Sequence, residues 1–187
     1  LGQRAVVQDL TALTRALFHP ADRIAWLAVL RAPWCGLTLA DLSALAGDDH
    51  RATVWTLMCE EARVQTLSAD GARRLTRVRG ILAEFIAARR RESAARWIEG
   101  AWLALGGPAC VGTRTDIEDA QAYFRLLETL EDGGDIADFA VLEENVAKLF
   151  AAADAQADTR LQLMTIHKAK GLEFDVVIVP GLGYTPR

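Results

Sequence analysis

The chain has 187 residues, of which about half are hydrophobic, and a formal net charge of −4 at pH 7. This length is enough for one domain, or one and a half, with a sizeable buried core. No apolar run reaches the length of a membrane span, which excludes a helical membrane protein. The first residues, Leu1 to Arg4, show neither an initiating methionine nor a signal-peptide pattern. We therefore expect a piece cut from a longer cytoplasmic protein.

Apolar residues recur at helical spacing along most of the chain. The first helix carries Val6, Leu10, Leu13 and Leu17, and Pro20 opens a second helix that stops before Pro33. A third, short helix is expected to begin at a Thr38–Asp41 capping box. Five further helices are expected over about 51–63, 69–91, 93–105, 115–130 and 135–150. Ser93, a Thr115–Glu118 capping box and Asp135 are the predicted N-terminal caps of the last three.

The C-terminal part has a different pattern. Residues 151–158 are small and polar and are predicted to be a linker, and the segments at 161–165 and 174–180 are predicted to be strands. The second of these is continuously apolar, as in a strand that is buried on both faces of a parallel sheet. We therefore predict a mainly α fold, in which a helical bundle over residues 1–158 is followed by two short strands within residues 159–187.

The loop between these strands has the sequence Thr165-Ile166-His167-Lys168-Ala169-Lys170-Gly171-Leu172-Glu173-Phe174. It resembles motif V of the UvrD/Rep/RecB-type superfamily 1 DNA helicases, including the AddA-like branch. The 17–41 stretch, with Leu-Arg-Ala-Pro-Trp-Cys-Gly-Leu, is similar to the helical subdomain inserted ahead of motif V. The resemblance implies that residues 1–158 are this inserted subdomain and that residues 159–187 are part of the second RecA-like P-loop NTPase domain.

The resemblance also implies roles for residues of the loop. Thr165 and His167 would contact single-stranded DNA through their hydroxyl and imidazole groups. Lys170, Gly171 and Glu173 would lie at the ATP site, where Gly171 permits close backbone approach and Glu173 accepts a hydrogen bond from the ribose. The intact bacterial helicase would use ATP and Mg²⁺ to move along single-stranded DNA and to unwind duplexes in DNA repair or recombination.

The chain alone is expected to lack ATP hydrolysis. A Walker A motif needs Lys followed by Ser or Thr, but the three lysines precede Leu149, Ala169 and Gly171. We therefore predict no catalytic residue, no metal site and no bound cofactor within these 187 residues.

A second candidate DNA surface is rich in arginine. Residues 73–96 contain eight Arg and two acidic residues, whereas residues 115–158 contain twelve acidic and two basic residues. The candidate contacts to duplex phosphates are Arg73, Arg74, Arg77, Arg89 and Arg90. The alternative is a solvated helix face, or pairing of these arginines with the acidic segment.

The cysteines and tryptophans are predicted to have structural roles. Cys35, Cys59 and Cys110 are far apart and are expected to be small, buried thiols in a reducing compartment. The five tryptophans lie mostly within apolar stripes, which favours core packing over base stacking.

Two further expectations concern partners. The alternative to a helicase is a non-catalytic helical protein-interaction module whose terminal strands pair with a partner. In either case the strand segment 174–180 has unpaired edges, so this chain should self-associate through it or leave it poorly ordered.

Overall fold

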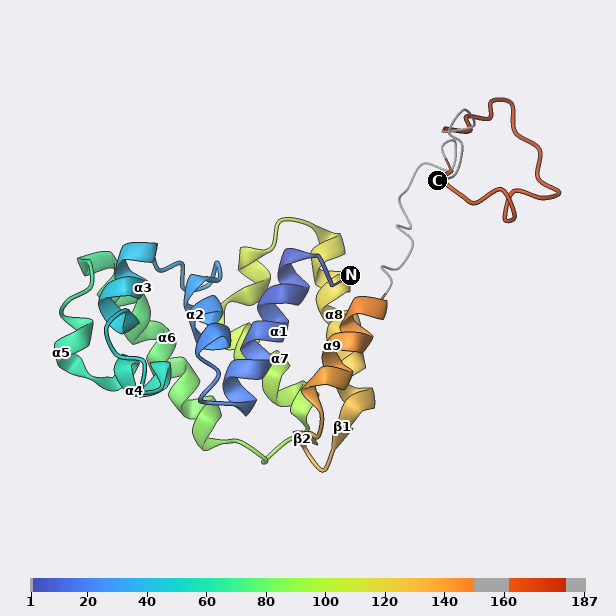
Figure 1. Cartoon of the computed structure of the whole chain (residues 1–187). Coiled ribbons are helices and arrows are strands. Elements are labelled where there is room, and N and C mark those ends of the chain that lie inside the picture. Colours follow the sequence, from blue (N-terminus) through green and yellow to red (C-terminus); the bar gives the residue numbers. More distant parts are fainter. Residues whose placement is uncertain (1, 150–161, 181–187) are drawn as a thin grey trace. The chain divides into compact units, whose positions relative to one another are not determined.

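The computed structural model describes residues 2–149 and 162–180 (Figure 1). The chain divides into two compact units, Leu1–Ala152 and Ala153–Arg187. The first unit is almost entirely helical, which confirms the mainly α fold. None of the helices in the described residues is long and apolar enough to cross a membrane.

The elements of the first unit follow one another with short connections. In chain order they are α1 Ala5–Phe18, α2 Arg23–Arg31, α3 Leu39–Ala46, α4 Val54–Cys59, α5 Glu61–Val64, α6 Ala69–Ala87, α7 Ala94–Leu105, the 3₁₀ turn η1 Gly107–Cys110, α8 Arg114–Leu130, β1 Glu131–Asp132, β2 Asp135–Ile136 and α9 Phe139–Lys148.

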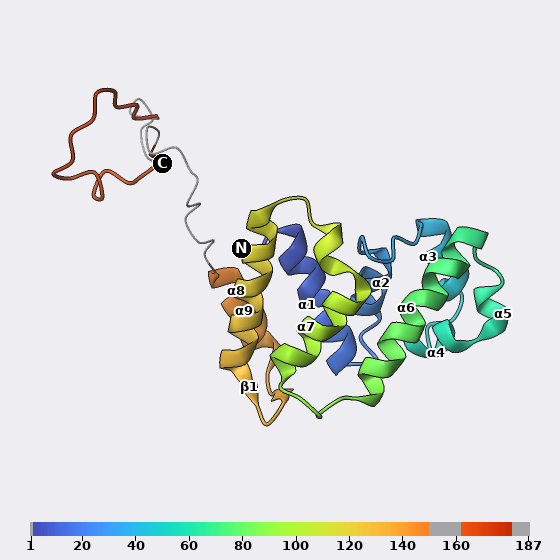
Figure 2. The ribbon, with the colours of Figure 1, turned by 180° about the vertical axis from the view of Figure 1, so that it is seen from behind.

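Helix α1 lies at the centre of the larger part of this unit. Helices α2, α7 and α8 pack against α1, and α9 lies against α8 (Figures 1 and 2). At the other end, α3, α4 and α5 gather around the N-terminal part of α6. The long helix α6 therefore connects the two ends of the unit.

One hydrophobic core runs through both ends, because each helix turns its apolar stripe inward. Helix α1 buries Val7, Leu10 and Leu13 completely. The hydroxyl of Thr14 on the same helix is also buried, and it accepts a 2.9 Å hydrogen bond from the hydroxyl of Tyr123 on α8. A buried polar pair that is satisfied in this way fixes the register of the two helices without an unpaired group.

The tryptophans belong to this core, as predicted. Trp26, Trp34, Trp97 and Trp102 are each at most 5% exposed. Trp55 is partly buried, and its ring lies 5.4 Å from that of Trp26.

Two predicted helix starts are confirmed and three are wrong. Pro20 does not open the second helix, because α2 begins at Arg23 and is capped by Asp22, whose side chain accepts a hydrogen bond from the Ala25 N–H. The Thr38 capping box opens α3 and Ser93 caps α7. Helix α8, however, begins with a capping box of Thr113 and Asp116. The sequence here contains two overlapping boxes, and because the earlier one starts the helix, Thr115 falls inside its first turn.

The segment after α8 was predicted to pass directly into another helix, and this prediction is wrong. Strands β1 and β2 form a two-residue antiparallel hairpin, in which Asp132 pairs with Asp135. Gly133 and Gly134 have φ values of +58° and +81°, the conformation that a tight hairpin turn requires and that glycine adopts at low cost. The cap of α9 is therefore Asp138, and Asp135 is free for another role.

Two predicted helices are shorter than expected. The helix over 51–63 divides into α4 and α5, because Glu60 between them is extended. Helix α6 ends at Ala87 and does not reach Arg91, and Arg90 in the following loop has a left-handed φ of +67°.

The C-terminal strands do not form in the described part of the second unit. Residues 162–180 contain turns and irregular backbone but no strand, while Leu161 and the linker 151–158 lie outside the described residues. A strand needs the hydrogen bonds of a neighbouring strand, and no such neighbour exists within 162–180. The side chains that were predicted to lie in the interior of a sheet are exposed instead, with exposed fractions of 97% for Leu163 and 82% for Ile178.

The cysteine prediction is correct in part. All three thiols are free, and Cys35 is buried, but Cys59 and Cys110 are exposed. The described residues hold no group of three or more His, Cys, Asp or Glu side chains arranged to bind a metal.

Candidate nucleic-acid and nucleotide interface

The motif loop forms one compact turn. The carbonyl of Thr165 accepts hydrogen bonds from the backbone N–H groups of Lys168 and Ala169, at 3.0 and 3.1 Å. The Thr165 hydroxyl accepts a second bond from the Lys168 N–H, at 3.3 Å. Thr165 therefore caps a helical turn, as threonine commonly does at helix starts.

The turn closes at Gly171. Its φ of +86° lies in the left-handed region, and the backbone N–H of Leu172 donates to the carbonyl of Ala169 at 3.0 Å. A side chain at position 171 would strain this backbone even though the space around it is open. This glycine is therefore required by the geometry of the turn, independently of any ligand.

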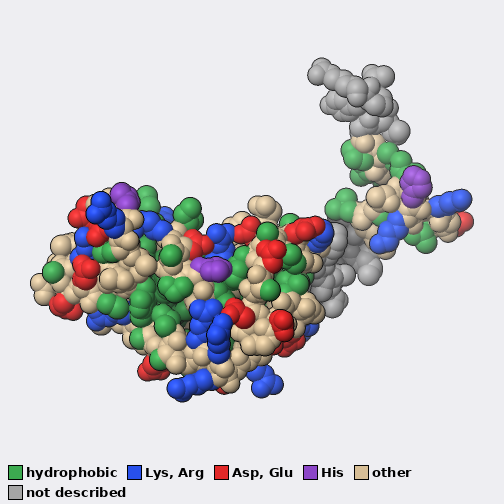
Figure 3. Space-filling model, turned by 60° about the horizontal axis from the view of Figure 1, so that its bottom comes forward, with side chains coloured by type: hydrophobic (Ala, Val, Ile, Leu, Met, Phe, Trp, Pro, Cys, Tyr) green, Lys and Arg blue, Asp and Glu red, His purple; other side chains and the backbone are tan. Residues whose placement is uncertain are grey.

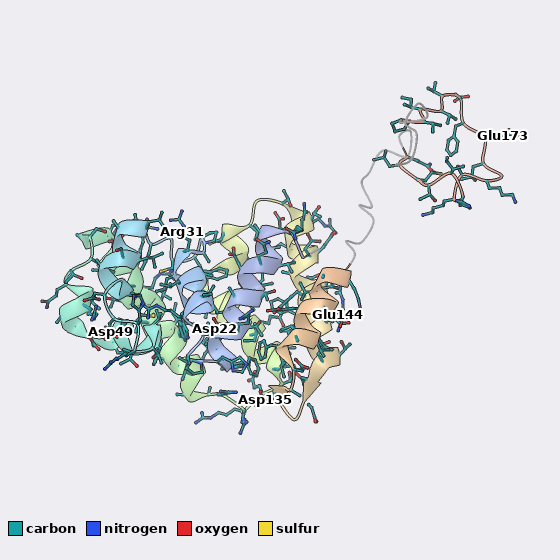
Figure 4. All side chains as sticks on the ribbon, viewed as in Figure 1. Asp22, Arg31, Asp49, Asp135, Glu144 and Glu173 are labelled. Carbon is teal, nitrogen blue, oxygen red and sulfur yellow. The ribbon has the colours of Figure 1, made fainter. Side chains whose placement is uncertain are left out.

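The side chains to which the resemblance assigns DNA or ATP contacts are all accessible. The five positions Thr165, His167, Lys170, Gly171 and Glu173 are exposed, and Glu173 is labelled in Figure 4. The apolar run that follows is exposed too, with Val176 at 78% and Val177 at 67%. Such a continuous apolar surface is typical of a segment that is covered in a larger assembly.

The arginines of α6 are largely engaged within the unit. Arg77 donates to the carbonyl of Leu105 at 3.4 Å and also to the carbonyl of Trp34. Arg79 donates to the carbonyl of Met58 at 3.1 Å. These guanidinium groups donate hydrogen bonds to backbone carbonyls at or near the ends of neighbouring helices, so they stabilise the packing of the unit.

Two further arginines of α6 share one acidic partner. Arg73 and Arg74 both pair with Asp70 in the first turn of the same helix, and Arg74 also donates to the carbonyl of Cys35 at 3.3 Å. Arg73 stays 78% exposed. Of the α6 arginines, it is the most available to an external phosphate.

Arg89 and Arg90, in the α6–α7 loop, pair with Asp135 of the hairpin. The distances are 3.6 Å from Arg89 and 2.8 Å from Arg90 (Figure 4 labels Asp135). The hydrogen bond from Arg90 is the main reason why the pKa of Asp135 lies below its usual range. Arg89 also lies over the Phe18 ring, 5.2 Å from its centroid. Arg89 and Arg90 therefore both pair with the acidic segment 115–158, which was one of the alternatives to DNA contact for the arginine-rich segment.

The remaining members of the cluster are less restrained. Within the described residues, the side chains of Arg91 and Arg96 have no hydrogen-bond or ion-pair partner, and both are exposed. Figure 3 looks at the face on which the α6–α7 loop lies, and basic side chains project from it. The sequence alone did not separate these free arginines from the engaged ones. The carbonyls that accept from Arg79 and Arg89 lie 21 and 71 residues away in the chain, beyond the reach of any local pattern.

Comparison with known proteins then identifies the family. Residues 85–185, more than half of the chain, match the UvrD-like helicase C-terminal domain. The chain belongs to this family. The UvrD-like match contains α7, α8 and α9 as well as the motif loop, so one family pattern extends over both units.

Relatives align with nearly the whole chain, including the part ahead of the UvrD-like match. An ATP-dependent helicase/nuclease subunit from Pelotomaculum thermopropionicum is 28% identical over 95% of this chain and 15% of its own length. The ATP-dependent DNA helicase Rep of Escherichia coli is 26% identical over 98% of this chain and 30% of its own length. The corresponding helicase/nuclease subunit from Carboxydothermus hydrogenoformans is 28% identical over 93% of this chain and 16% of its own length.

The chain thus spans between about a seventh and a third of these relatives. No solved structure matches the chain significantly. The boundary expected near residue 158 lies outside the described residues.

Proposed function

We propose that this chain is the part of an ATP-dependent DNA helicase that joins a helical subdomain to the motif V region of the second motor domain. The observation that carries the proposal is the motif loop itself, Thr165–Phe174, in a chain that belongs to the UvrD-like family. The family match favours this interpretation over a non-catalytic helical interaction module.

In the proposed mechanism, the motif loop contacts both ligands of the motor, the single-stranded DNA and the ATP. Thr165 and His167 contact the single-stranded DNA, and Lys170, Gly171 and Glu173 lie at the nucleotide. Because Thr165 caps the turn that Gly171 closes, a shift at one end of this turn moves the other end. Such coupling would let ATP-driven closure of the motor domains move DNA in the intact protein.

The cofactors follow from the same proposal. ATP and Mg²⁺ would bind to the intact helicase, whose other ATP-binding groups, including a Walker A lysine and hydroxyl, do not occur in these 187 residues. The chain alone is therefore proposed to be inactive as an ATPase. Its role in repair or recombination would belong to the whole protein.

A duplex contact by the helical unit is the finer part of the proposal. Arg73, Arg74, Arg77, Arg89 and Arg90 were the sequence candidates, and the contacts above leave Arg73 the most accessible of them. Arg91 and Arg96 extend the same basic segment with side chains that are unpaired among the described residues. We propose that duplex phosphates interact chiefly with Arg73, Arg91 and Arg96.

The test separates the two ends of the motif loop in the intact helicase that contains this chain. Glu173→Gln should raise the KM for ATP and leave the affinity for single-stranded DNA unchanged. His167→Ala should weaken binding to single-stranded DNA and leave the affinity for ATP unchanged. Lys168→Ala is the matched control, because this exposed side chain lies in the same turn and has no proposed role.

The readouts are steady-state ATPase kinetics and fluorescence anisotropy of a labelled oligonucleotide. Both substitutions should reduce DNA-stimulated ATPase by at least about tenfold, which corresponds to about 1.4 kcal/mol. The proposal fails if the two variants behave as the Lys168 control does, or if each affects both ligands equally.

A further inference from the structure

A small cavity opens on the helical unit. It lies among the N-terminal half of α1, the turn after α2, the end of α7 with η1, and the start of α8, and its volume is about 180 Å³. The residues that give it its chemistry are Asp9, Trp34, Trp102, Cys110 and Asp116.

Two fixed indole rings form the apolar part of the wall. The Trp34 indole N–H donates to the carbonyl of Val29 at 3.1 Å, which fixes its ring. The Trp102 ring lies so close to Gly107 that a Cβ atom at position 107 would be 2.0 Å from the indole nitrogen. The Phe124 ring packs against the Trp102 ring, with 5.7 Å between the ring centroids. Both rings are therefore held in place before any ligand arrives.

The polar part of the wall is acidic. Among the described residues, the Asp9 carboxylate has no hydrogen-bond or ion-pair partner, and burial raises its pKa to about 6. Asp116 uses one oxygen in the capping box of α8, and its other oxygen lies 3.8 Å from Arg4. Arg4 itself is engaged by Asp119 at 2.8 Å. The cavity therefore carries a negative charge that the described residues do not neutralise.

We propose that this cavity binds the guanidinium group of an arginine side chain presented by a partner protein. An ionised carboxylate beside apolar and aromatic side chains is an environment in which a guanidinium group gains bidentate hydrogen bonds while its weakly hydrated plane packs against the apolar wall. The volume is below that of a pocket for a whole drug-sized ligand, about 300–1,000 Å³, and suits a single side chain. The acidic wall disfavours nucleotides and DNA, whose phosphates it would repel.

Arginine suits this cavity better than lysine does. The guanidinium group is planar, stacks on aromatic rings and is less strongly hydrated than an ammonium group. Lysine offers a compact, strongly hydrated charge that loses more on entering a partly apolar cavity. The cavity should therefore discriminate between the two cations.

The experiment uses the whole 187-residue chain and three capped tripeptides, Gly-X-Gly, in which X is arginine, lysine or citrulline. Citrulline has nearly the shape of arginine without its charge. Binding at pH 7.5 is followed by NMR, through the indole N–H of Trp102 and the carboxyl carbon of Asp9. Asp9→Asn is the test variant, and Asp132→Asn, at an exposed acidic residue of the hairpin, is the matched control.

The arginine peptide should cause saturable shifts at both positions, with a dissociation constant in the millimolar range because it offers only one side chain. Its affinity should exceed that of lysine several-fold and that of citrulline by at least about tenfold. Asp9→Asn should abolish the preference for arginine, whereas Asp132→Asn should preserve it. Equal binding of arginine and citrulline, unchanged binding by the Asp9 variant, or no saturable shift at all would each overturn the proposal.

Discussion

A carbon atom at the Cβ position of Gly71 would lie 2.7 Å from Cγ of Asp41. Asp41 is in the first turn of α3 and is buried. Its carboxylate accepts hydrogen bonds from the Thr38 hydroxyl at 2.7 Å and from the backbone N–H of Ser68, the cap of α6, at 2.8 Å. One carboxylate thus holds the starts of two helices together, in a space that exists because residue 71 has no side chain.

Substitution of Gly71 should therefore destabilise the helical unit. Gly71→Ala should lower the free energy of unfolding by about 1–3 kcal/mol, because the added methyl group must displace a buried, fully bonded carboxylate. Gly80→Ala is the matched control in the same helix, where no atom lies within 4 Å of the added carbon. It should raise stability by up to about 1 kcal/mol, since alanine favours helix more than glycine.

Urea denaturation followed by circular dichroism measures both changes. Equal stability of the two alanine variants would show that the Asp41 carboxylate can move aside, and the proposed coupling of α3 to α6 would be wrong.

The raised pKa of Asp9 predicts an unusual pH dependence of stability. In the folded state this pKa is about 6, against an ordinary value of 3.8. The contribution of Asp9 to stability is therefore full below pH 3.8 and is lost as the pH rises through about 6, because the folded carboxylate must ionise in a partly buried site. Asp116 and Cys110 are the other ionisable groups that line the same cavity.

Removal of this charge should stabilise the protein at neutral pH. Asp9→Asn should raise the free energy of unfolding by about 1–2 kcal/mol at pH 7.5 and have little effect near pH 4. Denaturation of the variant, the original chain and Asp132→Asn at a series of pH values tests this. A stabilisation that does not change between pH 4 and pH 7.5 would assign the effect to the amide and not to the charge.

The arginines should separate into two classes. Arg91→Ala and Arg96→Ala remove exposed side chains that are unpaired among the described residues, so they should weaken binding to duplex DNA and hardly affect stability. Arg77→Ala leaves the carbonyls of Trp34 and Leu105 without their donor, so it should cost about 1–3 kcal/mol of stability.

Anisotropy of a labelled duplex at several salt concentrations measures the DNA part. Each lost phosphate contact should reduce the slope of log K against log [salt] by about 1. If the chain binds duplex with no salt dependence, or does not bind at low salt, the basic segment is not a DNA surface.

The sequence predicted the features that depend on neighbouring residues. Helical periodicity, the Thr38 box, the Ser93 cap and the buried tryptophans are all local signals, and all are observed. The motif loop was found in the same way, because its ten residues are contiguous. Local signals failed where two of them competed, as with Thr113 and Thr115, or where glycine pairs fit both a helix end and a hairpin turn.

The features that the sequence did not predict depend on residues far apart in the chain. Whether an arginine is free or bound is decided by partners such as Asp135 for Arg90, 45 residues away. The cavity that Asp9 lines is completed by Trp102, Cys110 and Asp116, from the other half of the helical unit. No periodicity or motif in the sequence indicates such long-range contacts, because they depend on how the helices pack.

The last prediction concerns the apolar segment of the second unit. Residues 174–180 were expected to form a buried strand, and in the described structure they have no partner strand and are exposed. The free energy that favours covering such a surface is about 25 cal/mol per Å². Two copies of the chain can cover it by pairing with each other, because an unpaired apolar strand is a template for association.

Deletion of residues 159–187 should therefore reduce self-association and leave the helical unit folded. Among the described residues, the core of that unit is built from positions before 150, so far-ultraviolet circular dichroism should retain its helical signal. Replacement of Val177 and Val179 by serine in the whole chain is the matched control, since it removes the apolar surface and keeps the length. Both changes should shift sedimentation toward the monomer. If the truncated chain instead loses its helical signal, the terminal segment belongs to the same core, and the two units are not independent.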